Sequence, residues 1–363
     1  MAVFTTINDP SAHFQAELYT GNGVDGTAQT FDGNSDLQPD LIWIKARNFV
    51  ASNIIFDSTR GVTKYIYTDE NNAEATDDNR ILSLDSNGFT TGTNVHTNDN
   101  NDTYVAYGWK VNGGSTSSNT AGAITTTVQS NATAGISMMK YTGPNTGNDS
   151  ANNSGAYWSM GHGLGATPEM VIVKGLGGAH NWYVWHKRLG AETSGHHLLM
   201  NTTAASTTNA NILWGNTAFS STLIEVGGWD VVNRNAQTYM VYCFKSIHGY
   251  SKFGGWQGNG AADGPFVYTG FKPAFVMAKG YAGTDDWIIL DHKRSGYNPE
   301  NEYLDANNAA AESDGSGVID FLSNGFKMRS TFSSLNYSTG EYIYAAFAEN
   351  PFVTSTGIPC TAR

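Results

Sequence analysis

Carboxylate and guanidinium groups recur at one spacing in two distant parts of the chain. Asp57 is followed three residues later by Arg60, and Asp291 is followed three residues later by Arg294. Such a pair can bind a ligand through charge-assisted hydrogen bonds, or it can form an ion pair that fixes the end of a strand. We favour the structural interpretation, because a structural position recurs in every copy of a unit, whereas a catalytic one usually survives in one copy.

Histidines and acidic loops are the candidates for metal binding. Five histidines fall between residues 162 and 197: His162, His180, His186, His196 and His197. No spacing matches a zinc signature, and adjacent histidines on a strand point to opposite faces. The Asp- and Asn-rich loops at 69–79 and 98–102 offer oxygen ligands, but they lack the spacing and terminal Glu of a calcium loop. The sequence therefore predicts no metal site, and calcium in these loops is the alternative.

Aromatic side chains offer a different chemistry, the contact with a glycan. The candidates for this contact are Trp182, Trp185, His196, Trp214 and Trp229. Exposed tryptophans between Asn and Asp are typical of a sugar-binding surface, whereas buried ones pack a core. The chain carries no nucleophile elbow, P-loop, dinucleotide fingerprint or Cys/His nucleophile pattern, so we predict no enzyme and no cofactor. A glycosidase carboxylate pair stays open, because its two members are distant in sequence.

Three copies of one segment must position these residues. In each copy a proline is followed six positions later by a lysine, with a mostly apolar run between them, and the lysines are Lys45, Lys174 and Lys279. Twelve residues after each lysine stands a polar residue: Asp57, His186 and Asp291. Each copy closes on an aromatic segment, at 103–110, 238–245 and 341–347. This gapless spacing predicts three repeats of one unit, of which the second is divergent.

The chain divides into six segments on this basis. They are an N-terminal arm at 1–17, repeat 1 at 18–112, a Ser/Thr/Gly-rich linker at 113–135, repeat 2 at 136–246, repeat 3 at 247–349 and a C-terminal tail at 350–363. The arm and tail carry apolar residues that water would surround on an isolated unit: Val3, Phe4, Phe14, Phe352, Val353 and Ile358. We expect at least one of these segments to pack on the first or last repeat, or on a neighbouring chain.

Composition and periodicity indicate an all-β fold. The chain has 363 residues, 41 of them glycine and 9 proline, and aromatic residues reach 12% while charged ones are only 14%. This is typical of many strands joined by turns. At 238–244 apolar side chains alternate on both faces, which indicates a strand covered on both sides. We therefore predict three tandem β-sandwich domains, jelly-roll-like and of similar topology.

Charge and hydropathy exclude several classes of protein. The net charge of −12 argues against a nucleic-acid binder, which needs a basic face. No window of 18 apolar residues is present, so we expect no membrane partner. We expect no signal peptide from the first residues, and the two cysteines do not make a disulfide framework.

Several of these motifs together resemble a known domain. The strings YTGNG at 19–23, DSTRG at 57–61, SNGF at 86–89 and TYVA at 103–106 accompany the proline-to-lysine runs. They resemble a domain of unknown function that is common in virion structural proteins of marine bacteriophages, as do residues 5–11 and 346–352. The resemblance covers nearly the whole chain. Repeat 2 departs from it, with His186 at the position of the aspartate.

The resemblance implies a place on a virus particle, and not a chemistry. Our hypothesis is a non-enzymatic bacteriophage virion structural protein, either a capsid decoration or a tail-associated appendage. Its implied partners are other virion proteins and other copies of itself in a homo-oligomer, with a trimer favoured. The alternative is a receptor-binding module of a tail fibre that recognises host-surface glycan through repeat 2, and a polysaccharide depolymerase is the third reading.

Overall fold

The chain is all-β, as the composition predicts. The computed structural model describes residues 5–145, 156–209 and 212–361, and most of their regular structure is antiparallel strand. The α-helices within these ranges have four residues each: α1 (Val95–Asn98), α2 (Asp230–Asn233) and α3 (Ser333–Asn336). Val3 and Phe4 lie outside the described residues.

The three repeats share one order of five strands. In repeat 1 the order is β1 (Phe14–Thr20), β9 (Thr103–Trp109), β3 (Leu41–Ala46), β4 (Ile54–Asp57) and β5 (Lys64–Tyr67). In repeat 2 it is β12 (Ile136–Thr142), β19 (Thr238–Phe244), β14 (Met170–Gly175), β15 (Trp182–His186) and β16 (His196–Leu199). In repeat 3 it is β20 (Ser251–Gln257), β27 (Glu341–Pro351), β22 (Phe271–Gly280), β23 (Trp287–Asp291) and β24 (Glu300–Asp305). The lysine-bearing segments thus form equivalent strands, as their spacing predicts.

The repeats differ in what surrounds these five strands. Repeat 1 adds β6 (Ala75–Thr76) and a separate sheet of β2 (Thr27–Gln29), β8 (Gly88–Thr91) and β7 (Ile81–Asp85). Repeat 2 adds β17 (Thr207–Thr208), β11 (Thr126–Asn131) and β10 (Ser117–Asn119), and a separate pair of β13 (Trp158–Gly161) and β18 (Leu223–Val226). Repeat 3 continues as a single sheet through β25 (Ser313–Leu322), β26 (Gly325–Met328) and β21 (Phe266–Tyr268). The five-strand order, and not a common second sheet, is what the repeats share.

Two segments that the sequence placed outside the repeats, the linker and the arm, contain strands. β10 and β11 lie within 113–135, the expected linker, and they extend the sheet of repeat 2. β1 begins at Phe14, within the expected arm, and pairs with β9 along its whole length. The Phe14 ring stacks on Phe347 of repeat 3 at 5.4 Å between centroids, which confirms that the arm packs on the protein's own repeats.

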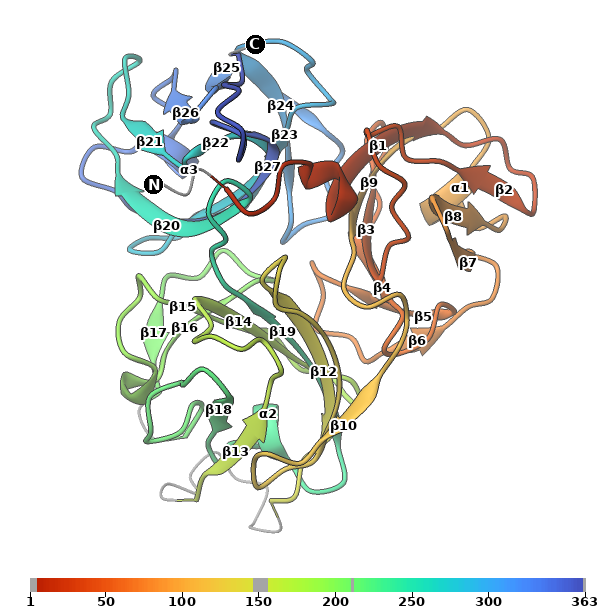
Figure 1. Ribbon diagram of the computed structural model, residues 1–363, viewed down its shortest axis with the longest axis vertical. Helices are drawn as coiled ribbons and strands as arrows, with labels where there is room; N and C mark the ends of the chain where they lie inside the picture. Colours follow the sequence, from red (N-terminus) through yellow and green to blue (C-terminus); the bar gives the residue numbers. More distant parts are fainter. Residues whose placement is uncertain (1–4, 146–155, 210–211, 362–363) are drawn as a thin grey trace.

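The main sheets of the three repeats surround a common centre (Figure 1). Alternate residues of each closing strand therefore belong to two different cores. On β19, Met240 and Tyr242 face the shared core, whereas Tyr239 and Val241 face the core of repeat 2 alone. β9 and β27 alternate in the same way. Both faces of the strand are buried, as its sequence predicts, and the second face is covered by the other repeats.

A tyrosine in each closing strand holds the one-turn helix before it. The Tyr104 hydroxyl donates to the Val95 carbonyl at 2.6 Å and accepts from the Asp99 amide at 2.8 Å. Tyr342 bonds the carbonyl of Ser333 and the amide of Tyr337 in the same way, at 2.6 and 2.7 Å. The turn that follows has a left-handed residue in every repeat: Asn101 (φ 68°), Ala236 (φ 58°) and Thr339 (φ 66°). The local scaffold is thus repeated as closely as the sheet.

Candidate functional site

The repeat positions singled out from the sequence lie where one repeat meets the next. Each lysine side chain is buried and reaches a main-chain carbonyl of the neighbouring repeat. The ammonium groups of Lys45, Lys174 and Lys279 donate to the carbonyls of Ala309 at 3.3 Å, Asn71 at 3.0 Å and Thr203 at 2.9 Å. Burial lowers the pKa of Lys45 and Lys279 to about 8 and that of Lys174 to about 7.

The residue eight positions after each lysine also crosses a junction. Asn53, Trp182 and Trp287 donate side-chain N–H groups to the carbonyls of Asp305 at 2.9 Å, Tyr67 at 2.8 Å and Leu199 at 3.0 Å. A main-chain bond lies beside each: the amides of Glu312, Glu74 and Ser206 donate to the carbonyls of Arg47 at 2.7 Å, Leu176 at 2.9 Å and Tyr281 at 2.8 Å. Three junctions therefore share one set of contacts, related by the repeat.

An ion-paired network occupies the junction between repeats 1 and 2. The side chains of Asp57 and Arg60 are fully buried, and the Arg60 Nε bonds the Asp57 carboxylate. The remaining guanidinium nitrogens reach Glu74 at 3.3 Å and the Ile55 carbonyl at 3.0 Å. Tyr242 of repeat 2 donates its hydroxyl to the same carboxylate at 2.8 Å. Each buried charge thus has several partners, which is the condition for a charge to be tolerated inside a protein.

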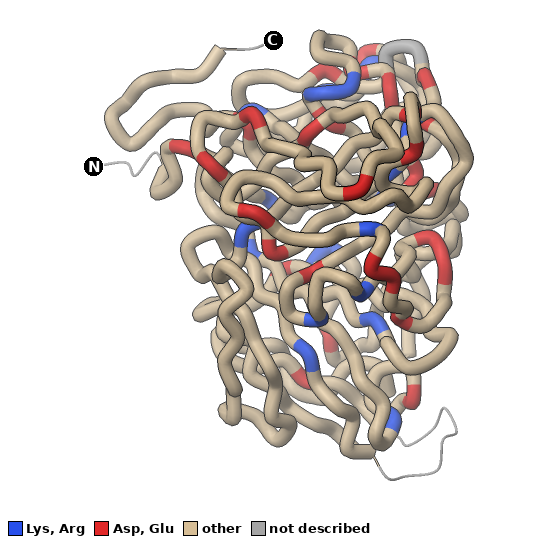
Figure 2. Tube along the Cα trace, turned by 90° about the vertical axis from the view of Figure 1, so that its right-hand side faces the viewer, with Lys and Arg blue, Asp and Glu red and all other residues tan. Residues whose placement is uncertain are grey.

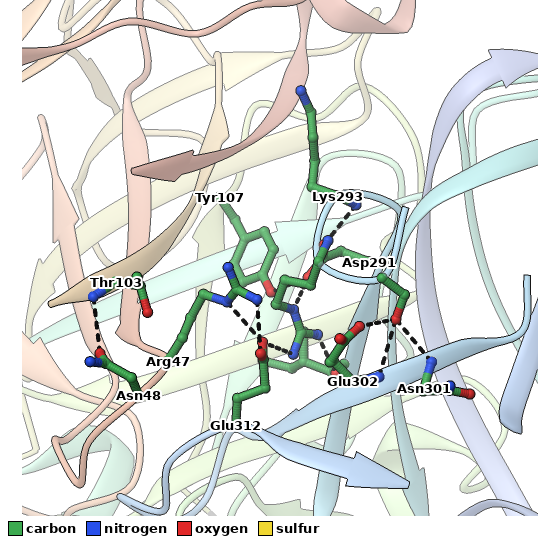
Figure 3. A network of polar contacts seen from close by, with 12 residues as sticks. Arg47, Asn48, Thr103, Tyr107, Asp291, Lys293, Asn301, Glu302 and Glu312 are labelled. Atoms are coloured by element: carbon green, nitrogen blue, oxygen red, sulfur yellow. Dashed lines mark hydrogen bonds and ion pairs between the residues drawn. The ribbon is translucent and has the colours of Figure 1, made fainter. Parts of the chain in front are cut away.

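The junction between repeats 3 and 1 repeats this network (Figure 3). Arg294 pairs with Asp291 and, at 3.2 Å, with Glu312. Tyr107 of repeat 1 donates its hydroxyl to Asp291 at 2.7 Å. Arg47 of repeat 1 adds a second ion pair to Glu312 at 2.8 Å. No peptide bond connects these two repeats directly, so side chains and main-chain hydrogen bonds close the arrangement.

The surroundings of Asp291 and Arg294 favour the charged form of both groups. Burial raises the pKa of the Asp291 carboxyl, but Arg294 and the Tyr107 hydroxyl outweigh that effect and leave it below its usual value. Burial acts to lower the pKa of Arg294, and Asp291 reverses this, so the guanidinium stays charged. A fixed, buried ion pair is suited to holding two surfaces together. It cannot exchange protons with a substrate that does not reach it.

The junction between repeats 2 and 3 has lost the network in a coordinated way. His186 stands at the position of the aspartates, and the buried Leu189 stands where the arginines are. Ala345 pairs with Met277 in the register in which Tyr242 pairs with Ile172, so it replaces the tyrosine. Ser206 replaces the glutamates, since its amide makes the equivalent main-chain bond. All four members of the network have changed together.

His186 itself is held neutral. Its Nδ1 accepts from the amide of Arg188 at 3.1 Å, and its ring is buried. Burial, with smaller contributions from Lys187 and Arg188, lowers its pKa to about 3. An apolar cavity of about 40 Å³ is lined by residues of all three repeats, Ala345 among them.

The glycan candidates of repeat 2 are largely interior. Trp182, Trp185 and Trp214 are 0%, 3% and 0% exposed, so their rings pack in cores and present no face to a sugar. Trp229 and His196 are partly buried. Within 5–145, 156–209 and 212–361, no group of three or more His, Cys, Asp or Glu side chains is placed to hold a metal ion. No helix of those ranges is long and apolar enough to cross a membrane.

Sequence reasoning missed the partners of the recurring carboxylates. Tyr107 and Tyr242 donate hydrogen bonds to carboxylates about 185 positions away in the sequence. Glu74 and Glu312, which pair with the arginines, lie in loops. A signal was present, because the two tyrosines occupy the same place in the aligned closing strands and the third strand has Ala345 there. Repeat 3 has no tyrosine at this position and repeat 2 has no aspartate at its own, and the two absences fall at one junction, which points to a contact.

A comparison with known families agrees with the extent of the repeats. The family model described as "Domain of unknown function (DUF7483)" matches residues 9–351, a range that includes all three repeats. Neither a curated protein nor a solved structure matches the chain.

Proposed function

Because the chain belongs to this family of unknown function, DUF7483, we propose its role from its geometry and its sequence: a non-enzymatic structural protein of a bacteriophage virion, acting through protein–protein assembly as a capsid decoration or tail-associated appendage. The observation that carries this proposal is the burial of the recurring ion pairs at the repeat junctions. Asp57 and Asp291 are 0% and 1% exposed. A catalytic carboxylate must reach its substrate, whereas a structural one must not lose its partners to water.

Rigidity is the property that this arrangement supplies. Three sheets share one core, and the junctions are joined by buried lysines, ion pairs and main-chain hydrogen bonds. A body of this kind keeps its outer surfaces at fixed angles, which suits a protein that must repeat the same contacts over a particle. The location on a phage particle rests on the resemblance of the sequence motifs.

The outer surface supports contact with protein partners. Most of the trace in Figure 2 is neither acidic nor basic. Several apolar side chains are exposed, including Val50 (74%), Phe266 (46%) and Tyr268 (51%). Polar, weakly charged surfaces with scattered aromatic residues are typical of wet protein–protein interfaces. The partners in this proposal are other virion proteins and further copies of this chain.

The location can be tested by the composition of purified particles. We expect quantitative mass spectrometry of gradient-purified virions to find the chain in a fixed ratio to the major capsid protein. A matched measurement on the lysate from which the particles were removed gives the unassembled fraction. Recovery of the chain in that lysate alone would overturn the proposal.

The oligomeric state is a separate part of the proposal. The resemblance favours a homo-oligomer, and a trimer in particular. The internal arrangement of three repeats about one centre is the alternative, because it provides a closed body within one chain. Light scattering of the purified chain at micromolar concentration distinguishes them: we expect a multiple of the chain mass, and the mass of one chain contradicts this part.

A further inference from the structure

Open pockets on this molecule differ in whether their polar side chains are already bonded. A pocket of about 510 Å³ lies between repeats 1 and 3. In it Gln15 bonds the Ser11 and Ser35 carbonyls and the Gly33 amide, and Lys293 pairs with Asp32. These groups are satisfied by the protein itself and offer little to a ligand.

A pocket of about 490 Å³ on repeat 2 is similar. Its Glu169 pairs with Lys187 at 2.9 Å, and the indole N–H of Trp185 donates to the Gly190 carbonyl. The Trp185 ring is 3% exposed, so this pocket has no aromatic face to present.

The pocket of about 480 Å³ on repeat 3 has the opposite character. It lies between the turn after β22 and the turn before β27. Its lining includes Thr284, Asp285, Ser333, Tyr337 and Thr339. Within the described residues, none of these five side chains makes a hydrogen bond. The residues that line this pocket therefore carry four hydroxyl groups and a carboxylate that make no hydrogen bond within the described protein and can bond a ligand.

The shape of this pocket favours a ring with one apolar face. Tyr337 is 64% exposed and contributes a flat aromatic surface at its wall. Gly280 and Gly340 also line it, and a Cβ at Gly280 would lie 2.2 Å from the Asp285 carboxylate. A side chain at that position would therefore displace the carboxylate. Glu341 also lines the pocket, and it accepts from the Tyr281 hydroxyl at 2.9 Å through one oxygen.

The side chains that line the pocket occur in repeat 3, although the turn that carries them is built in the same way in all three repeats. The tyrosine that holds the turn recurs as Tyr104, Tyr239 and Tyr342. At the position of Tyr337 the other repeats have Asp99 and Arg234, and at the position of Asp285 they have Ala51 and His180. The residues that hold the turn are thus separable from the residues that face the pocket.

We propose that the pocket between residues 280–285 and 333–342 binds a neutral saccharide. Tyr337 stacks on the C–H face of the sugar ring, and Asp285 accepts hydrogen bonds from adjacent sugar hydroxyls. The hydroxyls of Thr284, Ser333 and Thr339 match further sugar hydroxyls, as donors or acceptors. This site does not depend on the virion role, and it lies in repeat 3 rather than in repeat 2, where the sequence placed glycan contact.

A glycan array with the full chain tests the proposal, followed by isothermal titration with the neutral oligosaccharide that gives the strongest signal. We expect binding to a neutral oligosaccharide, and a loss of affinity of at least about tenfold in Tyr337→Ala and in Asp285→Asn. Tyr297→Ala is the matched control, because Tyr297 is 82% exposed in the same repeat and does not line the pocket. We expect Tyr297→Ala to bind the oligosaccharide with the affinity of the wild-type chain.

Three outcomes overturn the proposal. They are the absence of binding to every neutral oligosaccharide on the array, unchanged affinity in both pocket variants, and binding that EDTA abolishes, which indicates a metal-mediated site. Thermal unfolding of each variant confirms that it is folded. The exposed Tyr337 ring contributes little to the core, so Tyr337→Ala retains the wild-type midpoint within a few degrees.

Discussion

Tyr242 of repeat 2 donates its hydroxyl to the Asp57 carboxylate of repeat 1 at 2.8 Å, across 185 positions of the sequence. Tyr107 of repeat 1 makes the same bond to Asp291 of repeat 3, at 2.7 Å. Two of the three junctions are therefore joined by the same chemistry. In the third, His186 and Ala345 stand at the positions of the aspartate and the tyrosine. This relationship gives the recurring residues a structural role that can be measured.

Removal of one hydroxyl from a polar junction lowers stability. We expect Tyr107→Phe to reduce the free energy of unfolding by about 1–3 kcal/mol, because the buried Asp291 carboxylate loses a hydrogen-bond donor. Urea denaturation measures the change. Tyr297→Phe removes a hydroxyl from an exposed ring and is the control, with a change within about 0.5 kcal/mol. Equal effects in the two variants would contradict the structural role of the bond.

Acid weakens the junction between repeats 3 and 1 through Asp291. The folded state holds the pKa of this carboxyl below its usual value, so the carboxylate stabilises the fold above about pH 4. That contribution is lost as the pH falls through the lowered pKa. We expect the stability of the wild-type chain to decrease below about pH 4 more steeply than that of Asp291→Asn. Parallel curves for the two proteins would show that the carboxyl does not titrate in this way.

His186 acts over a different pH range. Its pKa is about 3 in the folded chain and about 6.5 when unfolded, so the unfolded state binds the extra proton between these values. We expect stability to decrease as the pH falls from about 6.5 to 3, by on the order of 1–4 kcal/mol from this group.

The variant His186→Asn removes this titration and keeps a side-chain acceptor near the Arg188 amide. Its stability should depend less on pH over that range than the wild-type stability does. His248→Asn is the control, because His248 is exposed. If His186→Asn and His248→Asn retain the same pH dependence, His186 is not the group responsible.

The sequence specified much of this architecture and little of its assembly. The proline-to-lysine spacing predicted three equivalent strands, and the alternation at 238–244 predicted a strand buried on both faces. Both follow from local rules of strand geometry. The junctions could not be predicted in this way, because Tyr242 and Asp57 meet only after three sheets have packed together.

Composition was a weaker guide than spacing. The segment 113–135 reads as a flexible linker, yet it contains β10 and β11, since an available sheet edge orders polar residues through main-chain hydrogen bonds and Val128 of β11 packs in a core. Tryptophans between polar residues are compatible with an exposed sugar-binding face or with a core, and Trp214 proves to be buried, with its N–H donating to the His196 carbonyl at 3.0 Å. In both cases the contacts made in the folded chain determined the structure more than the local amino-acid composition did.

The coordinated substitutions in repeat 2 predict a favourable coupling. His186→Asp alone places a carboxylate in a buried site without its arginine, and we expect it to cost about 3–5 kcal/mol. Adding Leu189→Arg supplies the guanidinium three residues later, as in Asp57 and Arg60. A double-mutant cycle should give an interaction energy of at least about 1 kcal/mol in favour of the pair. Additive effects would mean that the two positions do not form the unit seen in the other repeats.

The central claim of this account is that the three repeats form one cooperative body through their shared core and junctions. Hydrogen exchange measured by mass spectrometry tests it most directly, in the wild-type chain and in Tyr107→Phe. The hydroxyl that the substitution removes belongs to repeat 1 and bonds Asp291 of repeat 3. We predict that the slowest-exchanging amides of β9, β19 and β27 lose the same free energy of protection, because they open only when the whole body unfolds. Undiminished protection of β19 in repeat 2 would contradict the claim.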